Sequence, residues 1–312
     1  MSETNQPAPT TVADAQSGNW VDRYAPDWAK PYLRLARWDR PIGVWLLFWP
    51  CVWGLGLAAV ANPDRGFDWW AAILMLVGAG LMRGAGCTFN DIVDRDIDDK
   101  VARTRSRPIP SGQVTAREAL YFMIAQALLA SVILFQFNRF TVWACVASLV
   151  LVAIYPFMKR ITWWPQAFLG LAFSWGALAG WSSQTGGLAW PPVLLYAGAI
   201  LWVIGYDTLY ALQDIEDDAL IGVKSTARLF GEHVKPVVAV LYTAAFLLWM
   251  AAVLMAGGNV VFAALSMVAA GLLAWQVMTI DVAVPENPRT RFYSNHYVGI
   301  VLSLALLAEW VW

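Results

Sequence analysis

The sequence predicts an all-α, polytopic membrane protein with nine transmembrane helices. Of its 312 residues, 59% are hydrophobic and only 14% are charged, whereas soluble domains carry about 25% charged residues. Apolar runs of about 20 residues recur along the chain, and this is the length that a helix needs to cross a bilayer. The 19 tryptophans fit the same class, because tryptophan favours the membrane–water interface.

The expected elements follow one another in a simple order. Residues 1–27 are expected to be a disordered tail, because they are polar and contain Pro, Ser, Thr and Asn. Residues 28–312 are expected to form a single transmembrane domain, which opens with a basic amphipathic segment at 28–41 on the membrane surface. Nine apolar spans follow at about 42–61, 69–89, 119–137, 140–157, 165–184, 193–212, 235–256, 260–280 and 295–312.

The basic residues predict which end of each span faces the cytoplasm. If the N-terminus is cytoplasmic and the spans alternate, all of the 21 Lys and Arg except Arg65, Arg83 and Arg139 fall in cytoplasmic segments. Such an excess of positive charge marks the cytoplasmic side. The first residues have neither the apolar core of a secretory signal nor the arginine-rich, acid-poor composition of a transit peptide. We therefore expect a multi-pass protein of the bacterial inner membrane with a cytoplasmic N-terminus.

Charge and cysteine content argue against other classes of function. A net charge of −1 gives no basic footprint for a nucleic acid. Cys51, Cys87 and Cys145 fall in apolar stretches without metal-ligand spacing, so we interpret them as buried thiols. The two histidines, His233 and His296, are far apart and indicate no site on their own.

The acidic residues gather in two clusters. Ten of the 22 Asp and Glu lie within residues 90–100 and 207–218, and both clusters fall at the cytoplasmic end of an even-numbered span. On a helix, Asp91, Asp94 and Asp98 share one face, because residues three, four and seven apart are neighbours. Like charges so close together repel each other, and the spacing therefore indicates that a cation binds there.

The second cluster repeats this pattern, with Asp207, Asp214 and Asp218 on one helix face. A solvated helix end is the alternative interpretation. Against it, Asp207 lies within an apolar span, where an acidic residue is functional by default. The macrodipole also disfavours carboxylates at the C-terminal end of a helix.

The residue types indicate a magnesium and diphosphate site. Aspartate and asparagine are hard oxygen ligands, which suit Mg²⁺ rather than zinc or copper. Basic residues near the clusters would neutralise the remaining phosphate oxygens: Arg83, Arg103, Arg107, Lys159, Arg160 and Lys224. A diphosphate on a substrate that enters an apolar bundle indicates a polyprenyl diphosphate.

Both clusters resemble the motifs of the UbiA-type family of intramembrane aromatic prenyltransferases. The family pattern NDxxDxxxD is matched at every position by Asn90, Asp91, Asp94 and Asp98, and the second motif is matched by "YDTLYALQDIEDD" at 206–218. Flanking stretches such as "RPIGVWLLFWP", "YPFMKRITWWPQ" and "NHYVG" are similar to the branch of the family that acts on 4-hydroxybenzoate. The similarity runs from about residue 30 to the C-terminus.

The resemblance implies a helical bundle of nine spans, with a cytoplasmic cap formed by the loops after spans two and six. It also implies Mg²⁺ dependence and a step of ubiquinone biosynthesis. The implied metal and diphosphate ligands are Asn90, Asp94, Asp98, Asp214 and Asp218. Tyr155, Lys159 and Arg160 match family positions linked to diphosphate or to the aromatic substrate, and Arg83 matches a family arginine in span two.

As a mechanism, we expect the allylic C–O bond to ionise and the phenol ring to attack through the carbon ortho to its hydroxyl. Asp91, Arg160 and Asp207 are the expected catalytic residues. Two alternatives stay open for the ring proton, which either Asp91 or the released diphosphate removes. Two also stay open for the benzoate carboxylate, which either Arg160 or Arg83 holds.

Competing interpretations remain at this level. A sister enzyme with a haem or menaquinone precursor as acceptor would use the same motifs. A cation-coupled transporter would also need intramembrane acids, but it would place them near the midplane and not at one membrane face. The sequence does not indicate the prenyl chain length or the oligomeric state.

Overall fold

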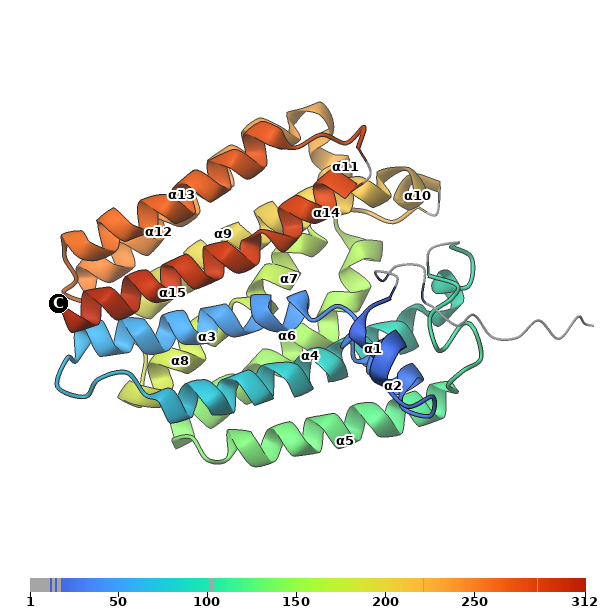
Figure 1. The fold of residues 1–312 in the computed structure, drawn as a ribbon, viewed down its shortest axis with the longest axis horizontal. Coiled ribbons are helices and arrows are strands. Elements are labelled where there is room, and N and C mark those ends of the chain that lie inside the picture. The colour runs from blue at the N-terminus through green and yellow to red at the C-terminus, as the bar shows by residue number, and fades with distance from the viewer. Residues whose placement is uncertain (1–11, 13–14, 16–17, 102–103, 221, 285) are drawn as a thin grey trace, which may run out of the picture. The chain divides into compact units, whose positions relative to one another are not determined.

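A computed structural model of the chain describes residues 12, 15, 18–101, 104–220, 222–284 and 286–312, with the backbone alone at 214 and 216–218. All regular elements in these ranges are helices (Figure 1), which confirms the all-α prediction. The chain divides into two compact units, residues 1–44 with 77–133 and residues 45–76 with 134–312. Each unit is described by itself below.

The long helices are α3 (Ile42–Ala61), α4 (Trp69–Asp98), α5 (Ala116–Leu134), α6 (Arg139–Ile161), α9 (Trp190–Ala211), α12 (Val234–Met255) and α13 (Val260–Thr279). The shorter α-helices are α1 (Trp20–Tyr24), α2 (Lys30–Leu35), α7 (Pro165–Phe173), α8 (Gly176–Thr185), α10 (Ile215–Leu220), α11 (Thr226–Phe230), α14 (Glu286–Tyr293) and α15 (Asn295–Val311). Two 3₁₀ turns, η1 (Leu212–Asp214) and η2 (Gly231–His233), complete the described elements.

Within the described ranges, seven helical segments are long and apolar enough to cross a bilayer, namely α3, α4, α5, α6, α9, α13 and the stretch Thr226–Met255. The protein is therefore a multi-pass membrane protein. Two of the nine expected spans differ. The span expected at 165–184 is divided between α7 and α8, with a break at Ser174 and Trp175. The last expected span forms α15, which has 17 residues.

Part of the tail that was predicted to be disordered, residues 20–24, is helical. Trp20–Tyr24 form α1, which the side chain of Asn19 caps by accepting hydrogen bonds from the backbone N–H groups of Val21 and Asp22. The Val21 side chain is completely buried. The Asn19 cap satisfies backbone N–H groups at the start of this short helix, and burial of Val21 stabilises it further. The sequence alone did not reveal these contacts.

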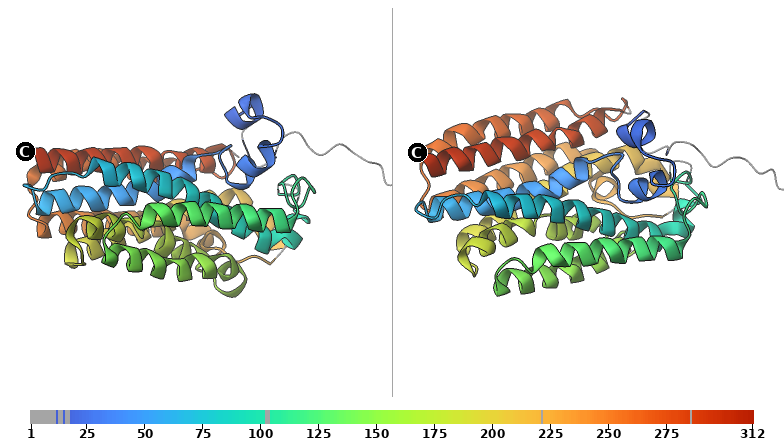
Figure 2. Two further views of the ribbon diagram at one scale, coloured as in Figure 1. Left: turned by 90° about the horizontal axis from the view of Figure 1, so that it is seen from below. Right: turned by 60° about the horizontal axis from the view of Figure 1, so that its bottom comes forward.

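In the second unit, helix α9 is held by a buried polar network. The indole N–H of Trp202 donates to the Asn295 side chain at 2.7 Å, and the Tyr242 hydroxyl donates to Gln276 at 2.8 Å. Gln276 in turn donates to the Ser294 hydroxyl at 2.9 Å. Buried hydrogen bonds are directional, so this network fixes α9 against α12, α13 and the α14–α15 junction. Figures 1 and 2 show α13 alongside α15.

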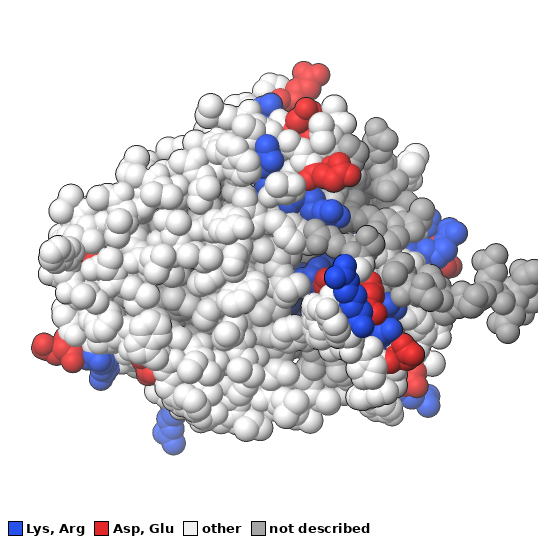
Figure 3. All heavy atoms as spheres, in the orientation of Figure 1, with Lys and Arg blue, Asp and Glu red and all other residues white. Residues whose placement is uncertain are grey.

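Helices of both units leave apolar side chains exposed, as a lipid-facing surface requires. Leu128, Leu129 and Val132 of α5 are exposed, as are Met267 and Val268 of α13. In the view of Figure 3, the surface over α13 and α15 is almost free of charged side chains. This pattern fits immersion of these helices in hydrocarbon.

Close packing between α3 and α8 gives a first test of the fold. A Cβ at Gly54 would lie 2.3 Å from the Ala177 carbonyl oxygen, which is backbone that cannot turn aside. We expect Gly54→Ala to lower the free energy of unfolding by about 2 kcal/mol, as overpacking does. Gly271→Ala on α13 is the matched control, because nothing lies within 4 Å of an added Cβ there. Thermal unfolding in detergent checks both variants, and equal midpoints would contradict the packing.

Candidate active site

The first acidic motif lies on the last turns of α4, in the unit formed by residues 1–44 and 77–133. Asp91 is completely buried, and Asp94 and Asp98 are 1% and 5% exposed. The helix runs on to Asp98, nine residues beyond the predicted span, so the three carboxylates do share one helix. Three acidic groups withdrawn from solvent need positive partners.

Two arginines supply positive charge to this motif. The Arg37 guanidinium donates from Nη2 to Asp91 Oδ1 at 2.7 Å. Nη1 of Arg107 donates to the same oxygen at 3.3 Å and to Asp98 Oδ2 at 2.9 Å. Arg107 was predicted to be near the acidic motif, and it bridges two of the motif's carboxylates. Arg37 was predicted only as a basic residue of the lead-in segment.

The segment that carries Arg37 packs into its unit through buried arginine side chains. Arg34 is 3% exposed and Arg37 is 8% exposed. Arg34 is paired with Asp22 of α1 at 2.8 Å, and its carbonyl oxygen accepts from Arg37 Nη1 at 2.9 Å. Arg37 also has a φ of 60°, a left-handed conformation that costs a non-glycine residue roughly 1–2 kcal/mol.

The loop after α4 is docked by its own small core, which fixes Arg107. Leu35, Val114 and Ala119 form a buried cluster, and Ile92 and Ile109 pack against it. At the start of this loop the Thr104 hydroxyl donates to the Asp98 carbonyl oxygen at 2.8 Å. The loop therefore holds the bridging arginine against the helix end. Arg103, the other predicted arginine of this loop, lies outside the described residues.

Arg83 lies deeper along α4 than the acidic motif. It precedes Asn90 by seven residues, which places the two on the same helix face about 10 Å apart along the axis. Its guanidinium lies against Gly43 at the start of α3, where an added Cβ would be 2.4 Å from Arg83 Nε. One cation and one carboxylate motif thus share a face of one helix.

The second acidic motif lies in the other unit, at the end of α9 and in η1 and α10. Asp207 is half-buried within α9, inside a candidate span as predicted. The next residue, Thr208, shares a 2.6 Å hydrogen bond with Thr226, whose backbone N–H donates to Gln166 at 3.0 Å. These contacts tie α9 to α11 and α7. The side chains of Asp214 and Asp218 lie outside the described part of the chain.

The predicted cations of the second unit gather at the end of α6. Lys159 and Arg160 occupy its last turn, with Tyr155 one turn earlier. Lys224 joins them, because its backbone N–H donates to the Lys159 carbonyl oxygen at 2.9 Å and its ammonium donates to the Ile161 carbonyl oxygen at 3.0 Å. A lysine at this position also complements the negative end of the α6 dipole.

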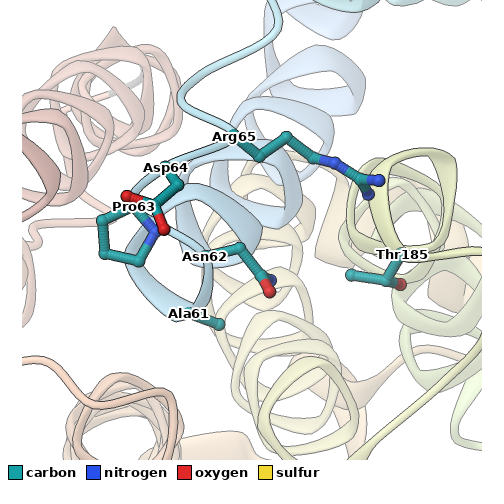
Figure 4. A pocket seen from close by; sticks show the side chains of 6 residues that line it. All are labelled: Ala61, Asn62, Pro63, Asp64, Arg65 and Thr185. Carbon is teal, nitrogen blue, oxygen red and sulfur yellow. The ribbon is translucent and has the colours of Figure 1, made fainter.

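A polar hollow in the same unit lies at the ends of α3 and α8, apart from the cations at the end of α6. Its lining comes from Ala61 at the end of α3, the turn at 62–65 and Thr185 at the end of α8, and Figure 4 shows Arg65 extending toward Thr185. The Arg65 guanidinium donates to the Gln184 carbonyl oxygen. None of the predicted site residues lines this hollow. The Arg65 hydrogen bond connects the α3–α4 turn with α8.

The geometry defines a helical membrane protein that concentrates carboxylates and arginines at the end of an apolar helix, as a carrier or enzyme of charged lipid-like substrates would. The chain belongs to the UbiA prenyltransferase family, whose model matches residues 47–300. The expected family membership is therefore confirmed.

Curated relatives support the same placement, and each is named "4-hydroxybenzoate polyprenyltransferase, mitochondrial". The protein of Aedes aegypti is 46% identical over 89% of this chain, which spans 63% of that relative's length. The protein of Bos taurus is 46% identical over 91% of this chain, which spans 76% of that relative's length. The protein of Homo sapiens is 44% identical over 92% of this chain, which spans 77% of that relative's length.

Solved structures share the fold. An apo UbiA homolog from Aeropyrum pernix K1 has a TM-score of 0.71 at 24% identity, covering 84% of this chain and 97% of that one. A UbiA homolog from Archaeoglobus fulgidus, bound to GPP and Mg²⁺, has a TM-score of 0.63 at 21% identity, covering 89% of this chain and 99% of that one.

Proposed function

We propose that this protein transfers a polyprenyl group from polyprenyl diphosphate to 4-hydroxybenzoate, at the ring carbon ortho to the hydroxyl, in a Mg²⁺-dependent membrane step of ubiquinone biosynthesis. The observation that carries the proposal is the set of relatives with this activity in their name, which match about nine-tenths of the chain at 44–46% identity. These relatives favour 4-hydroxybenzoate over a haem or menaquinone precursor as the acceptor.

The donor set of the first motif fits a magnesium ion. Its described ligands are oxygens only, and Asp91 and Asp98 already converge on one cationic group, the Arg107 guanidinium. In the described residues, no three Asp, Glu, His or Cys side chains form a metal cluster by themselves, and we propose that substrate oxygens complete the site. Asn90, Asp94 and Asp98 would hold it, with Asp214 and Asp218 from the second motif. When bound, Mg²⁺ neutralises the diphosphate leaving group.

Basic side chains around the motifs stabilise the same leaving group. Charge-assisted hydrogen bonds from arginine and lysine to phosphate are the strong kind, and the proposed donors are Arg103, Arg107, Lys159 and Lys224. Tyr155 would lie beside the diphosphate or the acceptor ring, one turn before Lys159. Stabilising charge on the departing diphosphate is the largest expected contribution to the rate.

The ring proton is the last group to leave. Asp91 is completely buried, and its Oδ1 accepts from two guanidinium groups, which favours the released diphosphate as the proton acceptor. Asp91 then serves as a fixed negative anchor for Arg37 and Arg107. Asp207 is proposed as the corresponding acid of α9, and Arg160 or Arg83 as the cation that holds the benzoate carboxylate.

The membrane arrangement belongs to the same proposal. We propose that the α7–α8 pair and α15 complete nine spans, because their sequences are largely apolar and only Ser174 and Trp175 separate α7 from α8. The described chain would then form one transmembrane domain in a bacterial inner membrane, with the N-terminus and both acidic motifs on the cytoplasmic side. The basic residues of the inner segments support this orientation.

A complementation experiment tests the function. The gene is expressed in a bacterial strain that lacks its own 4-hydroxybenzoate prenyltransferase, and quinone precursors are identified by mass spectrometry. We expect polyprenylated 4-hydroxybenzoate, and the mass gives the prenyl chain length. Restoration of prenylated naphthoate or of farnesylated haem in the corresponding deletion strains, without 4-hydroxybenzoate product, would replace the proposed acceptor.

A further inference from the structure

We propose that Gly43 is a positioning residue that gives the Arg83 guanidinium the space to hold the acceptor carboxylate. The inference rests on the proposed function and deepens it, because it selects Arg83 over Arg160 as the carboxylate-binding cation. Arg160 is exposed at the end of α6, whereas Arg83 is half-buried along α4. An acceptor bound in a water-poor pocket needs its countercharge inside that pocket.

Gly43 has no conformational reason to be glycine. It is the second residue of α3 and is not among the glycines with positive φ. Glycine in a helix costs roughly 1 kcal/mol relative to alanine, so its presence here calls for another cause. That cause is space, since a Cβ at this position would lie 2.4, 2.8 and 2.9 Å from Nε, Nη2 and Cζ of Arg83.

The segment that leads into α3, residues 36–43, packs against α4. Its Trp38 ring lies 3.3 Å from the position of a Cβ at Gly80, and its Arg37 is paired with Asp91. Residues 36–43 therefore contact α4 at several points between Gly80 and Asp91. Because Arg83 is about 10 Å deeper than Asn90, a carboxylate held there directs the ring toward the diphosphate end of the same helix face.

The clash with Gly43 would be relieved by the flexible end of the arginine rather than by backbone. Gly43→Ala is therefore expected to fold and to displace the guanidinium. We expect the KM for 4-hydroxybenzoate to rise roughly tenfold, as loss of a charge-assisted hydrogen bond would require, with the KM for geranyl diphosphate within about twofold of the wild-type value. In an Arg83→Ala background, the same glycine substitution should have no further effect.

Direct binding of benzoate and benzamide, measured by isothermal titration, separates this role from a structural one. Gly43→Ala should weaken benzoate binding roughly tenfold and leave that of the uncharged benzamide unchanged. Gly86→Ala on α4 is the matched control, because an added Cβ there meets nothing within 4 Å. Its benzoate affinity should equal that of the wild type.

The outcomes distinguish the two claims. A Gly43→Ala protein that retains wild-type benzoate affinity, or that loses affinity for benzoate and benzamide alike, would overturn the role of Gly43. A wild-type protein that binds benzoate but does not prenylate 4-hydroxybenzoate would instead overturn the proposed function. Thermal unfolding midpoints of all variants are recorded in parallel, so that a loss of fold is not read as a loss of binding.

Discussion

Replacing Asp94 by alanine is expected to lower the rate of prenyl transfer by about 10³-fold, the size seen when a group that stabilises developing charge is removed. Asp94 is 1% exposed and lies on α4 between Asp91 and Asp98. The rate is measured in membranes at saturating Mg²⁺ with a radiolabelled acceptor. An Asp214→Ala variant should lose a similar factor if both motifs bind one diphosphate.

The matched control for this experiment is Asp96→Ala. Asp96 has the same charge on the same helix, but its side chain is 82% exposed and its partner is the exposed Arg95. We expect near-normal prenyl transfer from this variant, because exposed ion pairs contribute little. Near-normal transfer by Asp94→Ala, or an equal loss in both variants, would refute the role given to the buried carboxylates.

Replacing Arg37 by alanine is expected to destabilise the protein by about 3 kcal/mol, because it leaves the buried Asp91 carboxylate with only one of its two cations. The loss should be reduced in the double variant Arg37→Ala with Asp91→Asn, which has no buried charge to compensate. Thermal unfolding of the purified single and double variants in detergent measures this coupling.

An Arg37→Gly variant separates the loss of the ion pair from the backbone strain that alanine would keep at position 37. The φ of 60° at Arg37 suits glycine, which should recover roughly 1 kcal/mol relative to alanine. We still expect Arg37→Gly to be less stable than the wild type, because the ion pair with Asp91 is lost. If the glycine variant were as stable as the wild type, the ion pair between Arg37 and Asp91 would contribute nothing measurable to the free energy of unfolding.

The helices and the first acidic motif were largely predictable from local pattern. The spacing of Asp91, Asp94 and Asp98 predicts a shared helix face, and α4 carries them on one. Arg107 was also predicted as a neighbour of the motif, because it follows closely in the sequence. These features depend on contacts within about 20 residues, which a sequence pattern encodes directly.

Tertiary partners were not predictable in this way. The sequence does not separate Arg37, which is buried against Asp91, from a basic residue that only sets the topology, because both occur beside a membrane span. Asn295 and Gln276 form the buried network that holds α9, and nothing in the sequence pattern marks either residue as a partner of that helix. The break between α7 and α8 was not predicted either, although Ser174 and Gly176 interrupt the apolar side chains of 165–181 at that point.

The most direct test of the proposed function is a balance of products from the purified protein. The protein is reconstituted in phospholipid vesicles with geranyl diphosphate and 4-hydroxybenzoate, with Mg²⁺ or with a chelator, and both diphosphate and aromatic product are quantified. The account predicts equal amounts of diphosphate and of 4-hydroxybenzoate substituted ortho to its hydroxyl, and neither without Mg²⁺. Diphosphate release without a prenylated ring, or substitution at another ring position, would contradict it.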